Sequence, residues 1–147
     1  MGLTIERLQE VDMGTALTLL EDVFAGEQNI PVTLNSIPEE REPIWWYVEN
    51  DSEMVGVIAG WKENDTWHLG RFAVDSRLRG LGIGKKLMKF ALGEIFKLGA
   101  ERIYTEARDV SVSILIKLGG KVIGEPFDFY GEPVTPMIIE KQAFFEE

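Results

Sequence analysis

The chain has 147 residues, of which 45% are hydrophobic and 27% charged, and it contains no cysteine. This length and composition predict a single domain over residues 1–147 with its own core, and they exclude an intrinsically disordered chain. A formal net charge of −10 argues against nucleic-acid binding, because neutralisation of phosphates supplies most of the affinity in such complexes. The chain has no apolar run long enough to span a bilayer, no signal pattern and no disulfide, which predicts a soluble cytoplasmic protein without membrane contact.

Hydrophobic periodicity and turn residues predict ten elements in the order β-α-β-β-β-α-β-α-β-β. The expected elements are Thr4–Leu8, Met13–Phe24, Ile44–Glu49, Met54–Trp61, Thr66–Val74, a long helix that begins at Ile83, Arg102–Ala107, Val110–Leu118, Lys121–Gly124 and Met137–Lys141. Short loops join the third, fourth and fifth elements into an antiparallel meander. Pro126, Pro133 and Pro136 predict an irregular loop before the last strand. The fold class that follows is α/β in the broad sense, with the strands and helices mixed as in α+β proteins.

The meander leads into a glycine-rich loop that is followed at once by a helix. Residues 71–89 read RFAVDSRLRGLGIGKKLMK, and the helix carries apolar residues at helical spacing, namely Ile83, Leu87, Phe90, Ala91 and Ile95. Glycines let a ligand approach the backbone closely, and the first N–H groups of a helix have no partner within it. The stretch also holds six cations and one acid in an acidic chain. Together these features predict a phosphate-binding site.

The loop departs from two common phosphate-binding motifs. Lys85 stands where the third glycine of G-x-G-x-x-G belongs, and Lys86 stands where a P-loop needs Ser or Thr. Instead, Arg79, Gly82 and Gly84 form the pattern R-x-x-G-x-G after the predicted strand. This pattern resembles the acyl-CoA-binding motif of the GNAT superfamily of N-acyltransferases, and the order of elements along almost the whole chain is similar to that of its members.

The resemblance implies a mixed, mostly antiparallel central sheet flanked by helices, in which two central strands splay apart to admit coenzyme A. It implies acetyl-CoA as the cosubstrate, with its pyrophosphate bound by the loop amides. Backbone N–H groups of Phe72 and Val74 are expected to bind the thioester carbonyl if the strand splays. The residues expected at the coenzyme are Phe72, Ala73 and Val74 on the strand and then Arg79, Gly80, Leu81, Gly82, Ile83, Gly84 and Lys85.

Two further patterns resemble one GNAT subgroup. Its signature VFxxEQxxP is matched by Val23, Phe24, Glu27, Gln28 and Pro31. Its late motif F-x-x-x-G-I-P-H-x-x-M is matched at Phe127, Gly131, Pro133 and Met137, with Glu132 in place of Ile and Val134 in place of His.

Acyl transfer to an amine benefits from a base, because an amine with a pKa near 10.4 keeps its proton at neutral pH. His68 is the only histidine of the chain. Strand alternation places it on one face with Gly70, Phe72 and Val74. It is the first candidate for the base, and the alternative interpretation is a half-exposed surface histidine.

Two glutamates are rival candidates for the base. Glu106 ends the strand after the long helix, and it would otherwise be a surface carboxylate paired with Arg108. Glu27 is a candidate through the subgroup signature, and it would otherwise belong to a turn at a helix end. No metal ligands are predicted.

The group that protonates the leaving thiolate is the main departure from the resemblance. GNAT proteins often carry a tyrosine for this role after the short helix, and Leu115 occupies that position here. The asparagine that usually precedes the tyrosine by seven residues is Arg108. Ser111, one turn before Leu115, and Tyr104, on the adjacent strand, are the candidates that remain.

The sequence therefore predicts an N-acetyltransferase that moves an acetyl group from acetyl-CoA to a primary amine by direct attack in a ternary complex. A non-catalytic acyl-CoA-binding module of the same fold is the alternative, and Leu115 favours it. The acceptor is expected to be a small-molecule or peptide amine, bound near residues 25–46, and a homodimer is left open. The tryptophans are expected mainly in the core or at its rim, with one of them free to line an acceptor pocket.

Overall fold

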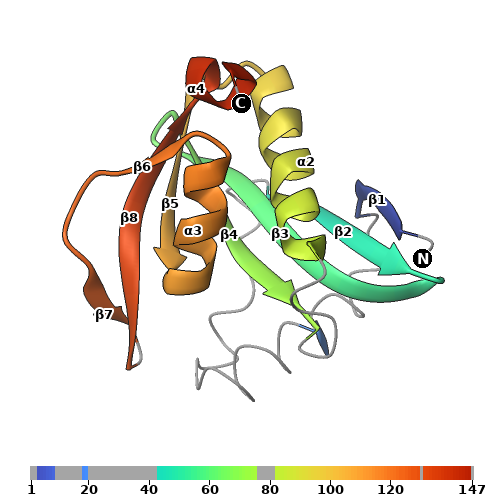
Figure 1. Ribbon diagram of the computed structural model, residues 1–147. Coiled ribbons are helices and arrows are strands. Elements are labelled where there is room, and N and C mark those ends of the chain that lie inside the picture. Colours follow the sequence, from blue (N-terminus) through green and yellow to red (C-terminus); the bar gives the residue numbers. More distant parts are fainter. Residues whose placement is uncertain (1–2, 9–17, 20–42, 76–81, 130, 147) are drawn as a thin grey trace.

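The structure is a computed structural model that describes residues 3–8, 18–19, 43–75, 82–129 and 131–146. Within these ranges, eight strands form one sheet in the order β1-β2-β3-β4-β5-β8-β6, and β7 pairs with β8 (Figure 1). The strands are β1 (Leu3–Arg7), β2 (Ile44–Asn50), β3 (Glu53–Glu63), β4 (Thr66–Val74), β5 (Arg102–Arg108), β6 (Gly120–Val122), β7 (Phe127–Phe129) and β8 (Glu132–Glu140). The helices of the described part are α2 (Ile83–Lys97), α3 (Asp109–Lys117) and α4 (Lys141–Glu146).

The predicted fold class is confirmed. Every strand pair is antiparallel except β4 and β5, which run parallel. These two strands pair only where residues 67–69 meet residues 103–105, and beyond that point they diverge (Figure 1). The divergence leaves a gap in the middle of the sheet, between the carboxyl ends of β4 and β5.

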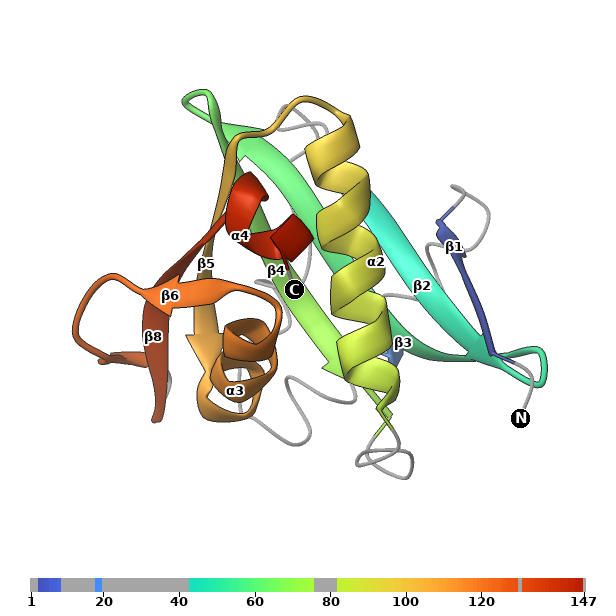
Figure 2. The same cartoon turned by 45° about the horizontal axis from the view of Figure 1, so that its top comes forward.

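Helices α2, α3 and α4 cover one face of the sheet, which we call the helix face (Figure 2). The buried side of α2 consists of Ile83, Leu87, Met88, Ala91, Leu92, Ile95 and Phe96. Gly60 of β3 allows α2 to lie close to the sheet, because a Cβ atom there would be 2.7 Å from Cδ1 of Ile95. The predicted apolar stripe is thus confirmed, with Phe90 only half-buried at its margin. Among the described residues, no helix is both long and apolar enough to cross a membrane.

The opposite face of the sheet has its own apolar cluster. Trp45, Tyr47, Val57, Ala59, Trp61 and Ala73 are buried there together with Leu8. Leu19 and Phe129 pack against this cluster from outside the central strands. The predicted helix Met13–Phe24 lies outside the described residues except for Thr18 and Leu19, which are helical.

The C-terminal part differs from the prediction. The last strand begins at Glu132 rather than Met137 and takes in both Pro133 and Pro136, and Lys141 begins α4 instead of ending a strand. The carbonyl of Pro136 accepts a hydrogen bond from the N–H of Ile123, so the proline nitrogen, which points to the same side, faces away from β5. A proline there removes no hydrogen bond from the β5–β8 ladder. Pro133 and Pro136 therefore lie within a strand and not in the predicted irregular loop.

Candidate active site

A cavity of about 430 Å³ lies where β4 and β5 diverge. Its lining comes from both faces of the sheet: Met88, Ser111 and Leu115 from the helix face, and Trp61, His68 and Glu106 from the opposite face. The buried hydroxyl of Thr105 donates a 2.7 Å hydrogen bond to the carbonyl of Leu69, at the last paired position of the two strands. This bond secures the apex of the gap, beyond which the cavity opens.

A β-bulge in β4 decides which residues face which side of the cavity. The register passes from Ala59–Gly70 to Val57–Ala73, so Arg71 and Phe72 together oppose a single residue, Ile58. Arg71 has a φ of 55°, a left-handed conformation that is rare for residues other than glycine. A bulge of this kind turns the following residues over to the other face of the sheet.

The bulge overturns one sequence-based expectation. Strand alternation placed His68, Phe72 and Val74 on the same face, but Phe72 and Val74 pack on the helix face, whereas His68 stacks on Trp61 on the opposite face. The N–H of Asp75 donates to the carbonyl of Val55, so the N–H of Val74, one residue earlier, points away from β3 and toward the gap. The bulge thus separates a helix-face half of the cavity from the half that holds His68.

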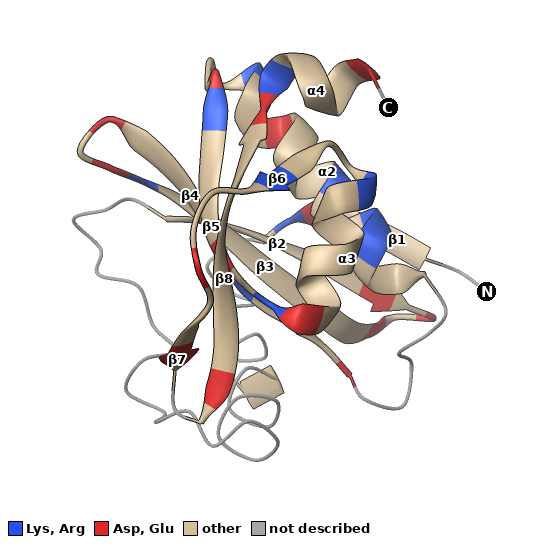
Figure 3. Ribbon diagram, turned by 60° about the vertical axis from the view of Figure 1, so that its left-hand side comes forward, with Lys and Arg blue, Asp and Glu red and all other residues tan. Residues whose placement is uncertain are grey.

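The start of α2 offers donors that no side chain caps. Gly82 is the N-cap, with a φ of 78°, and it has no side-chain cap bond. The first intrahelical bond runs from the N–H of Lys86 to the carbonyl of Gly82, so the N–H groups of residues 83–85 have no partner within the helix. The first turn holds no acid, and Lys85 and Lys86 are exposed there, among the lysines of α2 marked in blue in Figure 3. This arrangement fits an anion.

The predicted coenzyme-binding residues fall into two groups. Phe72 lines the cavity and Val74 is buried beside it on the helix face, while Ala73 is buried on the opposite face. Gly84 lies directly against Phe72, because a Cβ atom there would be 2.9 Å from its Cζ. Helix α2 therefore begins against the end of β4. Arg79, Gly80 and Leu81 lie outside the described residues.

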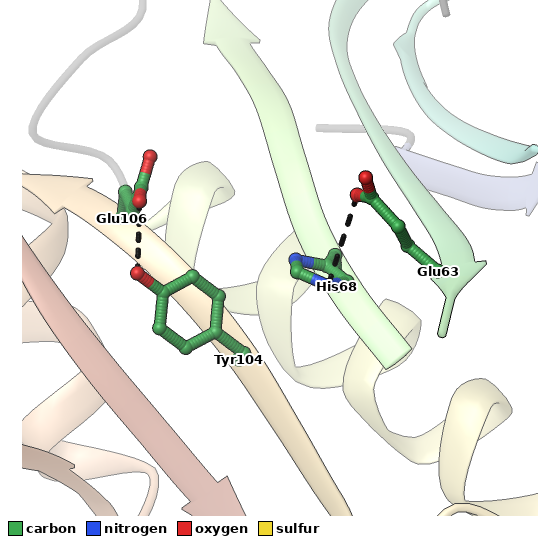
Figure 4. A network of polar contacts seen from close by, with 4 residues as sticks. All are labelled: Glu63, His68, Tyr104 and Glu106. Carbon is green, nitrogen blue, oxygen red and sulfur yellow. Dashed lines mark hydrogen bonds and ion pairs between the residues drawn. The ribbon is translucent and has the colours of Figure 1, made fainter. Parts of the chain in front are cut away.

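His68 lies in an aromatic and acidic setting on the opposite face (Figure 4). Its ring stacks on Trp61, with centroids 5.7 Å apart, and meets Tyr104 edge-on at 5.3 Å. Its Nε2 is 3.9 Å from Oε2 of Glu63. Glu63 lies at the end of β3, across the tight turn that leads into β4. A carboxylate in this position orients an imidazole and stabilises its protonated form.

Glu106 is held by a different partner than the sequence analysis expected. The hydroxyl of Tyr104 donates a 2.8 Å hydrogen bond to Oε2 of Glu106, while Arg108 lies 3.8 Å from Glu132 on β8. Burial, the hydrogen bond and the charge of Glu106 raise the pKa of Tyr104 from 10.0 to about 12. Tyr104 is therefore a weaker proton donor than an ordinary tyrosine.

Titration of Tyr104 should reveal this hydrogen bond. The folded protein holds the phenol proton more tightly than the unfolded chain, so the stabilisation is complete below pH 10 and is lost as the pH rises from about 10 to about 12. The difference in phenolate absorbance between the native protein and Tyr104→Phe should show a group that titrates near pH 12. Glu106→Gln should lower that pKa because the charge is removed, while burial, the largest cause of the shift, still holds it above 10. A Tyr104 that titrates near 10 in the native protein would contradict the described bond.

On the helix face, Leu115 and Ser111 lie one turn apart on α3, and both line the cavity. Leu115 is almost fully buried and offers no polar group. Ser111 is also buried, and it carries the hydroxyl that α3 contributes to the cavity lining. Of the two expected substitutes for the missing tyrosine, Ser111 is on the helix face and Tyr104 is on the face of His68.

The structure thus brings His68 and Glu106 to one half of the cavity, while Glu27 lies outside the described residues. Glu63 was not among the site residues predicted from the sequence. The predicted turn after Trp61 contained the signal, because a hairpin that pairs Trp61 with His68 also brings Glu63 close to the imidazole. Trp61, one of the tryptophans left free to line an acceptor pocket, lines this cavity.

Comparisons with known proteins agree with this architecture. Residues 15–124 match the model of the Acetyltransferase (GNAT) family. No curated protein sequence matches the chain. The fold is similar to that of Escherichia coli ElaA, with a TM-score of 0.82, 21% identity and coverage of 95% of this chain and 100% of that one.

Two further crystal structures share the fold. An acyl-CoA N-acyltransferase from Pseudomonas aeruginosa has a TM-score of 0.77 and 19% identity, over 94% of this chain and 98% of that one. The ribosomal-protein-S18-alanine N-acetyltransferase from Escherichia coli has a TM-score of 0.74 and 18% identity, over 95% and 94% of the two chains. With the family match over most of its length, the chain belongs to the GNAT acetyltransferase family and is an N-acetyltransferase of that type.

Proposed function

We propose that the protein transfers an acetyl group from acetyl-CoA directly to a primary amine, with both substrates bound at once. GNAT enzymes use acetyl-CoA or another acyl-CoA and act on small-molecule or peptide amines. The proposal rests on the cavity between β4 and β5, because this cavity is lined by side chains from both faces of the sheet. Such a cavity allows a donor from the helix face to meet an acceptor from the face of His68.

The N-terminus of α2 is the proposed site for the pyrophosphate of the coenzyme. The N–H groups of residues 83–85 and the lysines of the first turn supply the donors and the positive charge. The N–H of Val74 points into the gap, where it would donate to the thioester carbonyl and stabilise the oxyanion that forms there. Phe72, the second residue proposed for this role, lines the same cavity.

His68 is the proposed base. An amine with a pKa near 10.4 must lose its proton at a cost of roughly 4–5 kcal/mol at pH 7. His68 takes this proton and holds it as an imidazolium whose Nε2–H faces Glu63. Glu63, beside His68, and Glu106, beside Tyr104, attract the incoming ammonium. Glu106 and Glu27 remain the other candidates for the base.

In the transfer step, the amine nitrogen forms a bond to the thioester carbon and the carbon–sulfur bond breaks. Bound acetyl-CoA supplies the activated acetyl group and the thiolate leaving group. The Ser111 hydroxyl lines the same cavity as Leu115 and is placed to donate a hydrogen bond toward the leaving sulfur. As the carbonyl re-forms, the nitrogen loses its second proton and water relays a proton to the thiolate, so that the products are the amide, the free thiol and the imidazolium of His68. Ser111 thereby replaces part of the role that a tyrosine at position 115 would fill.

Release of free thiol tests the proposal. We expect acetyl-CoA with a panel of amines, amino acids, peptides and aminoglycosides to give thiol and N-acetylated product in equal amounts, with at least one acceptor far above the rate without amine. Thiol measured by absorbance and product measured by mass spectrometry provide the two readouts. Coenzyme A binding without amine-dependent thiol release from any acceptor would contradict transfer to a primary amine.

A further inference from the structure

Arg108 has a charged group inside the cavity that the proposed chemistry does not use. It is the last residue of β5 and the N-cap of α3, and its side chain is only 19% exposed. Alternation along β5 places it with Tyr104 and Glu106, on the face of His68. Its guanidinium therefore belongs to the half of the cavity proposed for the acceptor.

The surroundings of Arg108 leave its charge poorly compensated. Among the described residues, Arg108 forms an ion pair with Glu132, whose Oε2 lies 3.8 Å from Nη1, beyond hydrogen-bond distance, and whose side chain is 56% exposed. Nη2 is buried and has no hydrogen-bond partner among the described residues. Burial lowers the pKa of Arg108 from its ordinary value, as expected for a desolvated cation. A buried guanidinium with an unmade hydrogen bond is costly unless a ligand completes it.

The charges that line the cavity are balanced. Among the described residues, Glu63 and Glu106 contribute two carboxylates, and Arg71 and Arg108 contribute two guanidinium groups. Arg71 lies over the Trp61 ring at 5.5 Å, close to His68. In a chain of net charge −10, a cavity with this balance fits a ligand that carries both signs of charge better than a simple cation.

We infer that Arg108 binds a carboxylate of the acceptor, so that the preferred acceptor carries its amine and a carboxylate a few bonds apart, as an amino acid or a short peptide does. The inference rests on the proposed function. Two-residue spacing on β5 places Glu106 and Arg108 about 7 Å apart along the strand, which suits an ammonium near Glu106 and a carboxylate near Arg108. A guanidinium binds a carboxylate through two parallel hydrogen bonds, and that geometry would occupy Nη2.

The same chemistry would suit a carboxylate at the end of an acyl group, as in a dicarboxylic acyl-CoA. The acceptor is the better source because Arg108 lies on the face of His68, while α2 and its free N–H groups lie on the helix face. The experiment therefore varies the acceptor and the acyl donor separately.

The acceptor arm compares amino acids and dipeptides with their C-terminal amides and with the corresponding decarboxylated amines, all with acetyl-CoA. We expect kcat/KM to favour the carboxylate by about 10- to 100-fold in the native protein, the range of a charge-assisted hydrogen bond. Arg108→Gln should bring this ratio close to one. Arg108→Lys should keep only part of the preference, because an ammonium group lacks the two parallel N–H donors of a guanidinium. The matched control is Arg102→Gln, which removes the same charge from the exposed start of β5, outside the cavity, and should keep the ratio.

The donor arm compares succinyl-CoA with acetyl-CoA, using a decarboxylated amine as acceptor. We expect no preference for succinyl-CoA. A preference that Arg108→Gln removes would assign Arg108 to the acyl group and overturn the inference. A carboxylate ratio near one in the native protein, or a ratio that Arg108→Gln leaves intact, would also overturn it, while amine-dependent thiol release would still uphold the proposed function. The rise in Tm with acetyl-CoA, measured for each variant, verifies that the variant is folded and binds the donor.

Discussion

Replacing Gly82 with glutamate should abolish the rise in Tm that acetyl-CoA gives the native protein. At a concentration 100 times Kd, a ligand that binds only the folded state adds about 2.7 kcal/mol to the free energy of unfolding, or roughly 5–10 °C for a chain of this size. Gly82→Glu places a negative charge at the proposed pyrophosphate site, before the free N–H groups of α2. The loss of charge-assisted hydrogen bonds should raise KM for acetyl-CoA by about 10²-fold or more.

The structure provides a matched control for this variant at the other end of α2. Gly99 also has a positive φ, of 107°, and a Cβ atom would meet nothing within 4 Å at either glycine. Both substitutions should therefore cost about 1–2 kcal/mol of backbone strain. Only Gly82→Glu should lose the acetyl-CoA effect, whereas Gly99→Glu should lower Tm and keep the ligand-induced rise. If both variants respond to acetyl-CoA alike, the start of α2 is not the binding site.

Replacing His68 with glutamine should lower kcat/KM by about 10²–10⁴-fold, the usual contribution of a positioned general base. Glutamine approximates the size of the imidazole, so the contact with Trp61 is largely preserved. In the native protein, kcat/KM should rise with pH along a limb in the range of an imidazole, roughly pH 6–7, because only the neutral ring accepts a proton. The variant should lose this limb while its Tm still rises with acetyl-CoA.

Glu63→Gln tests whether Glu63 orients and stabilises the imidazolium of His68 without taking part in proton transfer itself. Without the carboxylate 3.9 Å away, the imidazolium is less stable, so the limb should move to lower pH and the plateau should fall less than in His68→Gln. If His68→Gln keeps both its rate and its pH limb, the base is not His68, and Glu106 and Glu27 remain as candidates. The pH dependence of kcat/KM measured for Glu106→Gln would then decide between these two.

Much of the fold follows from local patterns in the sequence. The meander, the long helix and the short helix α3 all lie within a few residues of their predicted ranges, because their apolar periodicity agrees with their final packing. The start of α2 was also predictable, since glycines and first-turn lysines mark the helix end for which we propose anion binding. These are features that neighbouring residues determine.

The parts that sequence analysis missed depend on tertiary pairing. The bulge at Arg71 reverses the alternation of β4. It could not be predicted from the residue type, because the positive φ of 55° is adopted by an arginine and not by a glycine. The partner of Glu106 proved to be Tyr104, two residues earlier on the same strand, while Arg108 turned to Glu132 of the neighbouring strand. Likewise, Pro136 is tolerated in β8 only because its nitrogen faces away from β5.

Initial-rate kinetics with acetyl-CoA and one productive amine varied together test the central claim most directly. Direct attack in the shared cavity predicts double-reciprocal lines that intersect, and no burst of thiol from acetyl-CoA alone. Parallel lines with a burst of thiol before the amine is added would reveal an acetylated enzyme. That result would contradict transfer in a ternary complex and would point to a nucleophile on the protein.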